Sequence, residues 1–147
     1  MLFSFNSIAQ NSERKFKIHT LAFYNLENLF DTINDVNKND EASPIMEIKF
    51  NRSGIYKQKI ANMAKVISEI GYDVTNRPPT IVGICEVENR KVVEDLISDE
   101  KLKNYNYGIV HYESPDDRGI DVGLIFNKDV FKVKNSNSHD VFITGNN

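Results

Sequence analysis

The chain has 147 residues, of which 40% are apolar and 27% charged, and 18 basic against 21 acidic side chains give a net charge of -3. This length predicts one domain, and the composition excludes the disordered and membrane-spanning classes. The charge argues against a protein that grips nucleic acid through a broad basic field, but an enzyme that approaches phosphodiesters through divalent cations remains compatible with it. The single cysteine, Cys85, excludes an internal disulfide.

The first residues, "MLFSFNSIAQ", are apolar and end in small residues at Ser7 and Ala9, as a signal-peptidase site does. A positive region before the apolar stretch is missing, and that stretch is short for a complete signal. Two interpretations stay open: residues 1–9 are the remnant of a signal peptide, which implies export to the periplasm or the medium, or they are a disordered arm.

The next segments predict a strand, a loop and a helix. Residues 16–26 favour a strand, because both of its alternating faces are apolar or β-prone, which is typical of a strand covered on both sides. Residues 31–54 are polar and rich in Asp and Asn, which predicts a long surface loop. Residues 55–70 place apolar side chains at helical spacing, and Gly71 supplies a stop signal.

The second part of the chain repeats the pattern and then becomes β-prone. Residues 80–85 predict a buried strand, and residues 89–100 predict a helix capped by Asn89. The remaining β-prone segments are short: residues 105–113, 119–127, 130–135 and 140–145. A strand, a helix, a strand, a helix and then several strands predict an α/β layered domain.

Polar side chains stand where the two predicted central strands end. Asn25 and Glu27 follow the first strand, and Glu86 and Glu88 follow the second. If these strands are parallel neighbours, Asn25 and Glu86 emerge side by side at the edge where α/β sheets bind ligands. An amide oxygen beside a carboxylate suits Mg²⁺ or Mn²⁺. The simpler alternatives are a helix cap for Asn89 and a solvent-facing position for Glu88.

Three motifs, "YNLENLFD", "GICEVENR" and "HYESPDDRGIDVGLIFN", occur in this order. Together they resemble the N-terminal half of the endonuclease/exonuclease/phosphatase family, which includes deoxyribonuclease I, across residues 18–127. The resemblance implies an α/β fold, part of a four-layer α/β sandwich with mixed β-sheets flanked by helices.

The resemblance also implies a Mg²⁺-dependent phosphodiester hydrolase, with Mn²⁺ as an alternative ion. By motif position, Asn25 and Glu86 are its catalytic and metal-site residues: Glu86 binds the cation, and Asn25 orients a metal-bound water or an acidic neighbour. DNA or RNA is the first expectation for the substrate, and a phospholipid headgroup or a small phosphodiester is the rival.

The loop "SPDDRG" carries a candidate substrate-binding residue. Arg118 could reach a phosphate oxygen, or it could form a salt bridge within the loop with Asp116 or Asp117. Asp121, at the start of the following strand, is expected to order this loop.

The histidines do not match the rest of the family pattern. The chain has only His19, His111 and His139, and the family's Asp-x-Asn and Ser-Asp-His motifs lie farther downstream. No role is assigned to His111, and the catalytic role is not carried onto His139. We therefore expect residues 16–147 to be the N-terminal portion of such a domain, inactive alone and with an exposed apolar face. The alternative is a non-catalytic divalent-ion-binding or interaction module on the same scaffold.

Overall fold

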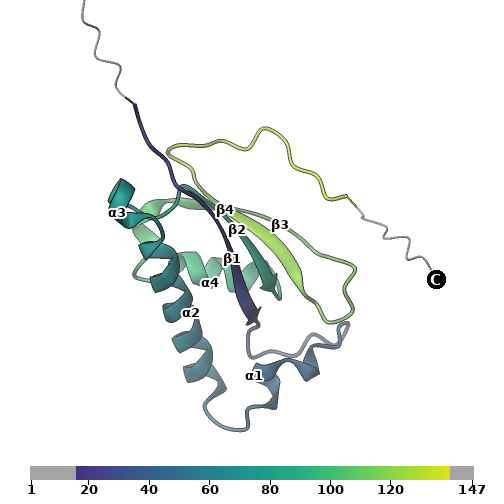
Figure 1. The fold of residues 1–147 in the computed structure, drawn as a ribbon. Coiled ribbons are helices and arrows are strands. Elements are labelled where there is room, and N and C mark those ends of the chain that lie inside the picture. Colours follow the sequence, from purple (N-terminus) through teal and green to yellow (C-terminus); the bar gives the residue numbers. More distant parts are fainter. Residues whose placement is uncertain (1–15, 140–147) are drawn as a thin grey trace, which may run out of the picture.

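The computed structural model describes residues 16–139 and shows four strands in one mixed sheet (Figure 1). The order across the sheet is β1-β2-β4-β3, and β1 and β2 run parallel while the other neighbours are antiparallel. The strands are β1 (Leu21–Leu29), β2 (Ile81–Val87), β3 (Tyr107–Tyr112) and β4 (Asp121–Asn127). The predicted α/β class with a mixed sheet is confirmed. The described residues contain one β-sheet.

Two helices, α2 (Arg52–Glu69) and α4 (Arg90–Ser98), cover one face of this sheet (Figure 1). Each buries apolar side chains three or four residues apart, which is the spacing of one helix face. Short helical turns occupy the connections: η1 (Asp40–Ala42), α1 (Pro44–Glu47), α3 (Tyr72–Thr75) and η2 (Lys103–Tyr105). No helix in the described part of the chain is both long and apolar enough to cross a membrane.

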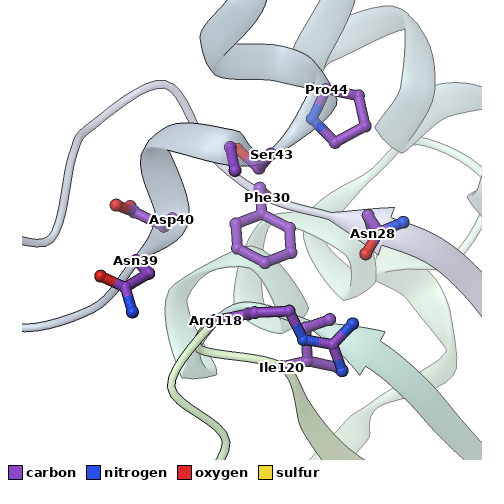
Figure 2. Close-up of a pocket in the computed structure, with 9 residues that line it drawn as sticks. Asn28, Phe30, Asn39, Asp40, Ser43, Pro44, Arg118 and Ile120 are labelled. Atoms are coloured by element: carbon purple, nitrogen blue, oxygen red, sulfur yellow. The ribbon is translucent and has the colours of Figure 1, made fainter.

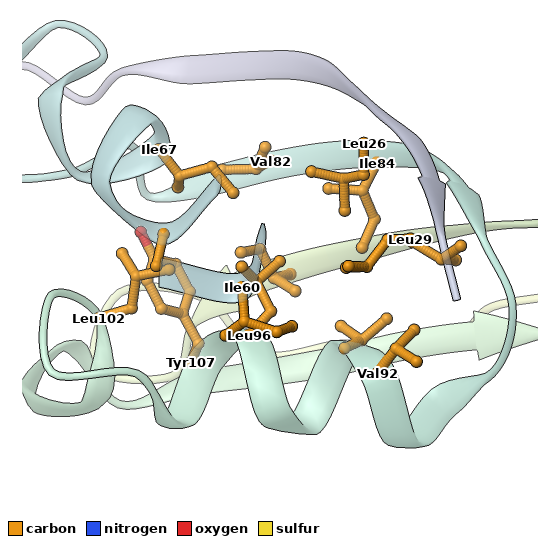
Figure 3. Packing of buried hydrophobic residues seen from close by; sticks show 14 residues of the cluster. Leu26, Leu29, Ile60, Ile67, Val82, Ile84, Val92, Leu96, Leu102 and Tyr107 are labelled. Atoms are coloured by element: carbon orange, nitrogen blue, oxygen red, sulfur yellow. The ribbon is translucent and has the colours of Figure 1, made fainter. Parts of the chain in front are cut away.

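The hydrophobic core lies between the sheet and these helices (Figure 3). Strand residues and helix residues contribute together: Leu26, Val82, Ile84 and Ile125 from the sheet, and Ile60, Ala64, Ile67, Val92 and Leu96 from the helices. Because side chains alternate along a strand, the residues between them point to the opposite face. On that face Leu21, Phe23 and Val122 are exposed, so the predicted exposed apolar face is present among the described residues.

The ends of α2 and α4 show how the sequence sets the helix limits. Asn89 caps α4, since its Oδ1 accepts a hydrogen bond from Val92 N at 3.0 Å, which confirms the predicted cap. After α2, Gly71 adopts a φ of 66°, and a Cβ there would lie 2.8 Å from the Thr20 side chain. Glycine therefore fits this position on both counts.

Some predicted limits are wrong. The first strand continues to Leu29, beyond the predicted end at residue 26, and the loop 31–54 contains η1 and α1. Residues 130–135 form no strand in the described structure. Residues 140–145 and residues 1–9 lie outside the described range.

Candidate active site

The candidate site lies where the parallel strands β1 and β2 end. Asn25 pairs with Cys85 in the sheet, and directly after this pair both strands lose their regular register. Asn25 Nδ2 donates a hydrogen bond to Glu86 Oε1 at 2.8 Å, so the predicted juxtaposition of these two side chains is confirmed. The parallel pairing of β1 and β2 places both residues at the same sheet edge, since parallel neighbours end there together.

The backbone at this edge adopts unusual conformations. Glu27, Asn28 and Glu86 have φ values of 50°, 57° and 59°, in the left-handed region that residues with a Cβ rarely adopt. Each such residue costs on the order of 1 kcal/mol and persists only where the surrounding contacts fix it. Because the bulges lie on neighbouring strands, they turn the Asn25 and Glu86 side chains toward each other.

Hydrogen bonds hold the bulges in place. Asn28 N donates to Glu86 Oε2 at 3.1 Å, and Glu27 N donates to Asn25 Oδ1 at 2.6 Å. Each oxygen of Glu86 thus has one donor, and a carboxylate has about four lone-pair sites, so two remain for a cation. Glu86 is half-buried and Asn25 is exposed. This all-oxygen, accessible donor set fits a hard divalent ion such as Mg²⁺.

Lys59 on α2 is a residue of this site that the sequence did not reveal. Its Nζ donates to the carbonyl oxygens of Glu27 and Asn28, the latter at 2.8 Å. Burial lowers the pKa of Lys59, and the nearby Glu27 and Glu86 carboxylates oppose that effect. The lysine thereby ties the β1 bulge to the helix layer. No local pattern marks it, because the contact joins residues 31 positions apart.

A cleft of about 260 Å³ opens beside the bulges (Figure 2). Its walls come from the end of β1, the η1–α1 turns and the loop before β4: Asn28, Phe30, Asn39, Asp40, Ala42, Ser43, Pro44, Arg118 and Ile120. Figure 2 shows Asn28 on β1 and Arg118 on the loop before β4 among the residues that line the cleft. The cleft therefore brings the Arg118 guanidinium near Asn28, whose backbone N–H donates to Glu86.

Arg118 also makes the predicted salt bridge within its loop. Its Nε and Nη2 donate to the two oxygens of Asp116 at 3.0 and 2.8 Å. Hydrogen bonds from Arg118 lower the pKa of Asp116 to about 2. The two expectations for Arg118 are compatible, because it lines the cleft while Asp116 holds its orientation.

The solvent-facing position expected for Glu88 is wrong, because this residue is buried. Only 7% of the residue is exposed, and its Oε2 accepts a hydrogen bond from Asp31 N at 2.6 Å. Burial raises the pKa of Glu88 to about 7, the bond from Asp31 N opposes this, and the Asp31, Asp40 and Asp35 carboxylates add to the rise. The loop that follows β1 folds over Glu88, and that long-range contact is not visible in local sequence.

A second polar group lies at the same end of β3 and β4. Candidate ligand atoms of His111, Glu113 and Asp121 all lie within 4.8 Å of one another, so the three side chains form a possible metal-binding group. Asp121 Oδ1 accepts from Ser114 N at 2.7 Å, which confirms its predicted part in ordering the loop. His111 was assigned no role from the sequence, because its partners become visible only through the strand register.

Comparison with known proteins agrees with the fold and the motifs. The model of the Endonuclease/Exonuclease/phosphatase family matches residues 20–147, and the chain belongs to this family. A search of curated proteins and a search of solved structures found no significant match.

Proposed function

We propose that this chain forms the N-terminal, cation-binding portion of a Mg²⁺-dependent phosphodiester hydrolase, with Mn²⁺ as a possible substitute ion. The observation that carries the proposal is the Asn25–Glu86 hydrogen bond of 2.8 Å at the bulged ends of two parallel strands. Membership of the endonuclease/exonuclease/phosphatase family supports the reaction class.

Each residue of the site has a distinct part in this proposal. Glu86 supplies the carboxylate ligand, and Asn25 is a positioning residue that holds one Glu86 oxygen through its amide. Arg118 lies in the adjacent cleft and offers hydrogen bonds to a phosphate oxygen. A divalent ion, when bound, would neutralise phosphate charge and favour attack by water.

The substrate is a phosphodiester, and DNA or RNA is the first proposal. The cleft of about 260 Å³ and the net charge of -3 keep a small phosphodiester or a phospholipid headgroup as the rival. Comparing hydrolysis of duplex DNA, RNA and a small aryl phosphodiester would separate these classes. For localisation we propose export, on the basis of the signal-like residues 1–9.

One observation favours the alternative of a non-catalytic divalent-ion-binding module. Within residues 16–139, the cleft beside Glu86 is lined by no histidine that could serve as a general acid or base. We therefore expect turnover by this chain alone to stay near background with Mg²⁺. Robust hydrolysis would contradict that expectation and favour a complete catalytic site.

The decisive experiment is a Mg²⁺ titration of the full chain followed by isotope-edited NMR. Shifts should concentrate at Asn25, Glu86 and Asn28, and Glu86→Gln should weaken binding at least about tenfold, because it removes the only anionic ligand proposed. Asn25→Ala should weaken it about 10-fold by releasing the carboxylate. Glu27→Gln is the matched control, an exposed carboxylate in the same turn. Equal affinity in Glu86→Gln and the unmodified chain would overturn the proposal.

A further inference from the structure

The antiparallel register of β3 and β4 brings three potential metal ligands together. Tyr112 pairs with Val122, and His111 pairs with Gly123. One step beyond the last pair, Glu113 lies opposite Asp121, and His111 is two residues back on the same face of β3. A histidine and two carboxylates therefore converge at the end of this hairpin.

Two of these side chains are buried with unused ligand atoms. The His111 and Asp121 side chains are 4% and 0% exposed. His111 Nε2 and Asp121 Oδ2 lie 3.0 Å apart, yet their geometry makes no hydrogen bond, and neither atom has another partner in the described structure. Two ligand atoms of a tetrahedral zinc ion, each about 2.0–2.1 Å from it, are about 3.3–3.4 Å apart. The observed separation of 3.0 Å lies within a few tenths of an ångström of that spacing.

The charge balance also favours a cation. Among the ion pairs of residues 16–139, neither Glu113 nor Asp121 is paired with a lysine or arginine. Like charges opposite each other on neighbouring strands destabilise a sheet, and a buried carboxylate is costly without a counter-charge. A bound divalent ion would relieve both effects.

The site has an open side. Glu113 is exposed and borders a hollow of about 50 Å³ that Asp35, Asp40 and Glu88 also line. This hollow is large enough for water. Asp40 is 2% exposed, and its Oδ1 has no hydrogen-bond partner. Three carboxylates and Lys38, whose Nζ donates to the carbonyl oxygens of Ser114 and Asp116, therefore border the approach to Glu113, and water beside it could complete a coordination shell.

We propose a second metal site in which His111 Nε2, Asp121 Oδ2 and the Glu113 carboxylate bind a transition-metal ion of the Zn²⁺ class. Imidazole nitrogen suits Zn²⁺, whereas Mg²⁺ prefers oxygen ligands alone. The site shares no residue with the Asn25–Glu86 pair and stands independently of the hydrolase proposal. The position of this metal site also predicts what a bound ion would do. Asp121 Oδ1 binds Ser114 N, and Ser114 Oγ donates to Ile120 O at 2.7 Å, so the ion would fix the loop that carries Arg118.

The test is titration of the full chain with Co²⁺, read by its visible d–d absorption, followed by displacement with Zn²⁺. One ion per chain should give a histidine-dependent band. His111→Asn should weaken Zn²⁺ binding at least about 30-fold, and Glu113→Gln at least about 10-fold. His139→Gln, which changes an exposed histidine, should leave affinity within about twofold.

A second set of measurements separates this site from the proposed hydrolase site and from a simple His–Asp pair. Glu86→Gln should retain the Co²⁺ band. Failure of the proposed Mg²⁺ site would therefore not affect the test of the His111 site. Zn²⁺ should also shift the His111 Nε2 resonance in ¹⁵N NMR. Glu113→Gln is the safest variant for folding because Glu113 is exposed. If this variant binds Zn²⁺ as the unmodified chain does, and the His111 resonance does not shift, the side chains form only an ion pair and the proposal is wrong.

Discussion

The two faces of the sheet use similar side chains but lie in different surroundings. On the covered face, Ile84 is fully buried beneath the helices, whereas on the open face Phe23 is 73% exposed with its ring over Gly83. Both residues lie in segments whose apolar alternation predicted burial on both sides. Apolar periodicity therefore identifies the strand, but it does not reveal which face another layer covers.

The largest effect should come from opening a cavity in the covered face. Ile84→Ala should reduce the free energy of unfolding by about 2–4 kcal/mol, because it removes buried methyl groups and leaves a void. Urea denaturation measures this loss. The matched variant on the open face, Phe23→Ala, should change stability by less than about 1 kcal/mol. Equal losses in the two variants would contradict the assignment of one covered and one open face.

Two carboxylates at the end of β2 also differ in their exposure to solvent. Glu86 emerges at the bulge and is half-buried, whereas Glu88 is enclosed by the loop after β1. Burial raises the pKa of Glu88 to about 7, against about 4.3 in an unfolded chain. Between these values the folded state retains a proton that the unfolded state has released. The free energy of unfolding should therefore fall as the pH rises from about 4 to 7.

Glu88→Gln should remove about 1–2 kcal/mol of this pH dependence, since the amide does not titrate. Unfolding at several pH values in a chelator-containing buffer measures the difference without metal. The control is Glu69→Gln, which changes an exposed carboxylate on α2 and should keep the pH profile of the unmodified chain. A Glu88→Gln profile parallel to that of the unmodified chain would show that Glu88 is ionised in the fold throughout this range.

The sequence predicted the features that depend on local pattern and strand direction. Helix α4 and its Asn89 cap follow from spacing and a capping side chain. The meeting of Asn25 and Glu86 follows from two parallel strand ends, once the strands are taken as neighbours. The role of this pair in binding Mg²⁺ stays a prediction.

The features that escaped prediction all depend on contacts between distant segments. Lys59 reaches the β1 bulge from a helix, and Glu88 becomes buried only when residues near Asp31 fold over it. His111 meets Asp121 through the register of a hairpin. Local residue types leave these outcomes open, because the same glutamate or histidine fits an exposed strand end equally well.

The smallest effect on stability should come from making the open face polar, yet this change tests the comparison most directly. Phe23→Ser combined with Val122→Thr should alter the free energy of unfolding by about 1 kcal/mol or less, since both side chains are exposed. The same double variant should lose at least about half of the fluorescence of a bound hydrophobic dye, because contiguous apolar surface binds such probes. Unchanged dye fluorescence with unchanged stability would mean that the apolar side chains of this face are covered in solution, and that the two faces differ less than their exposure indicates.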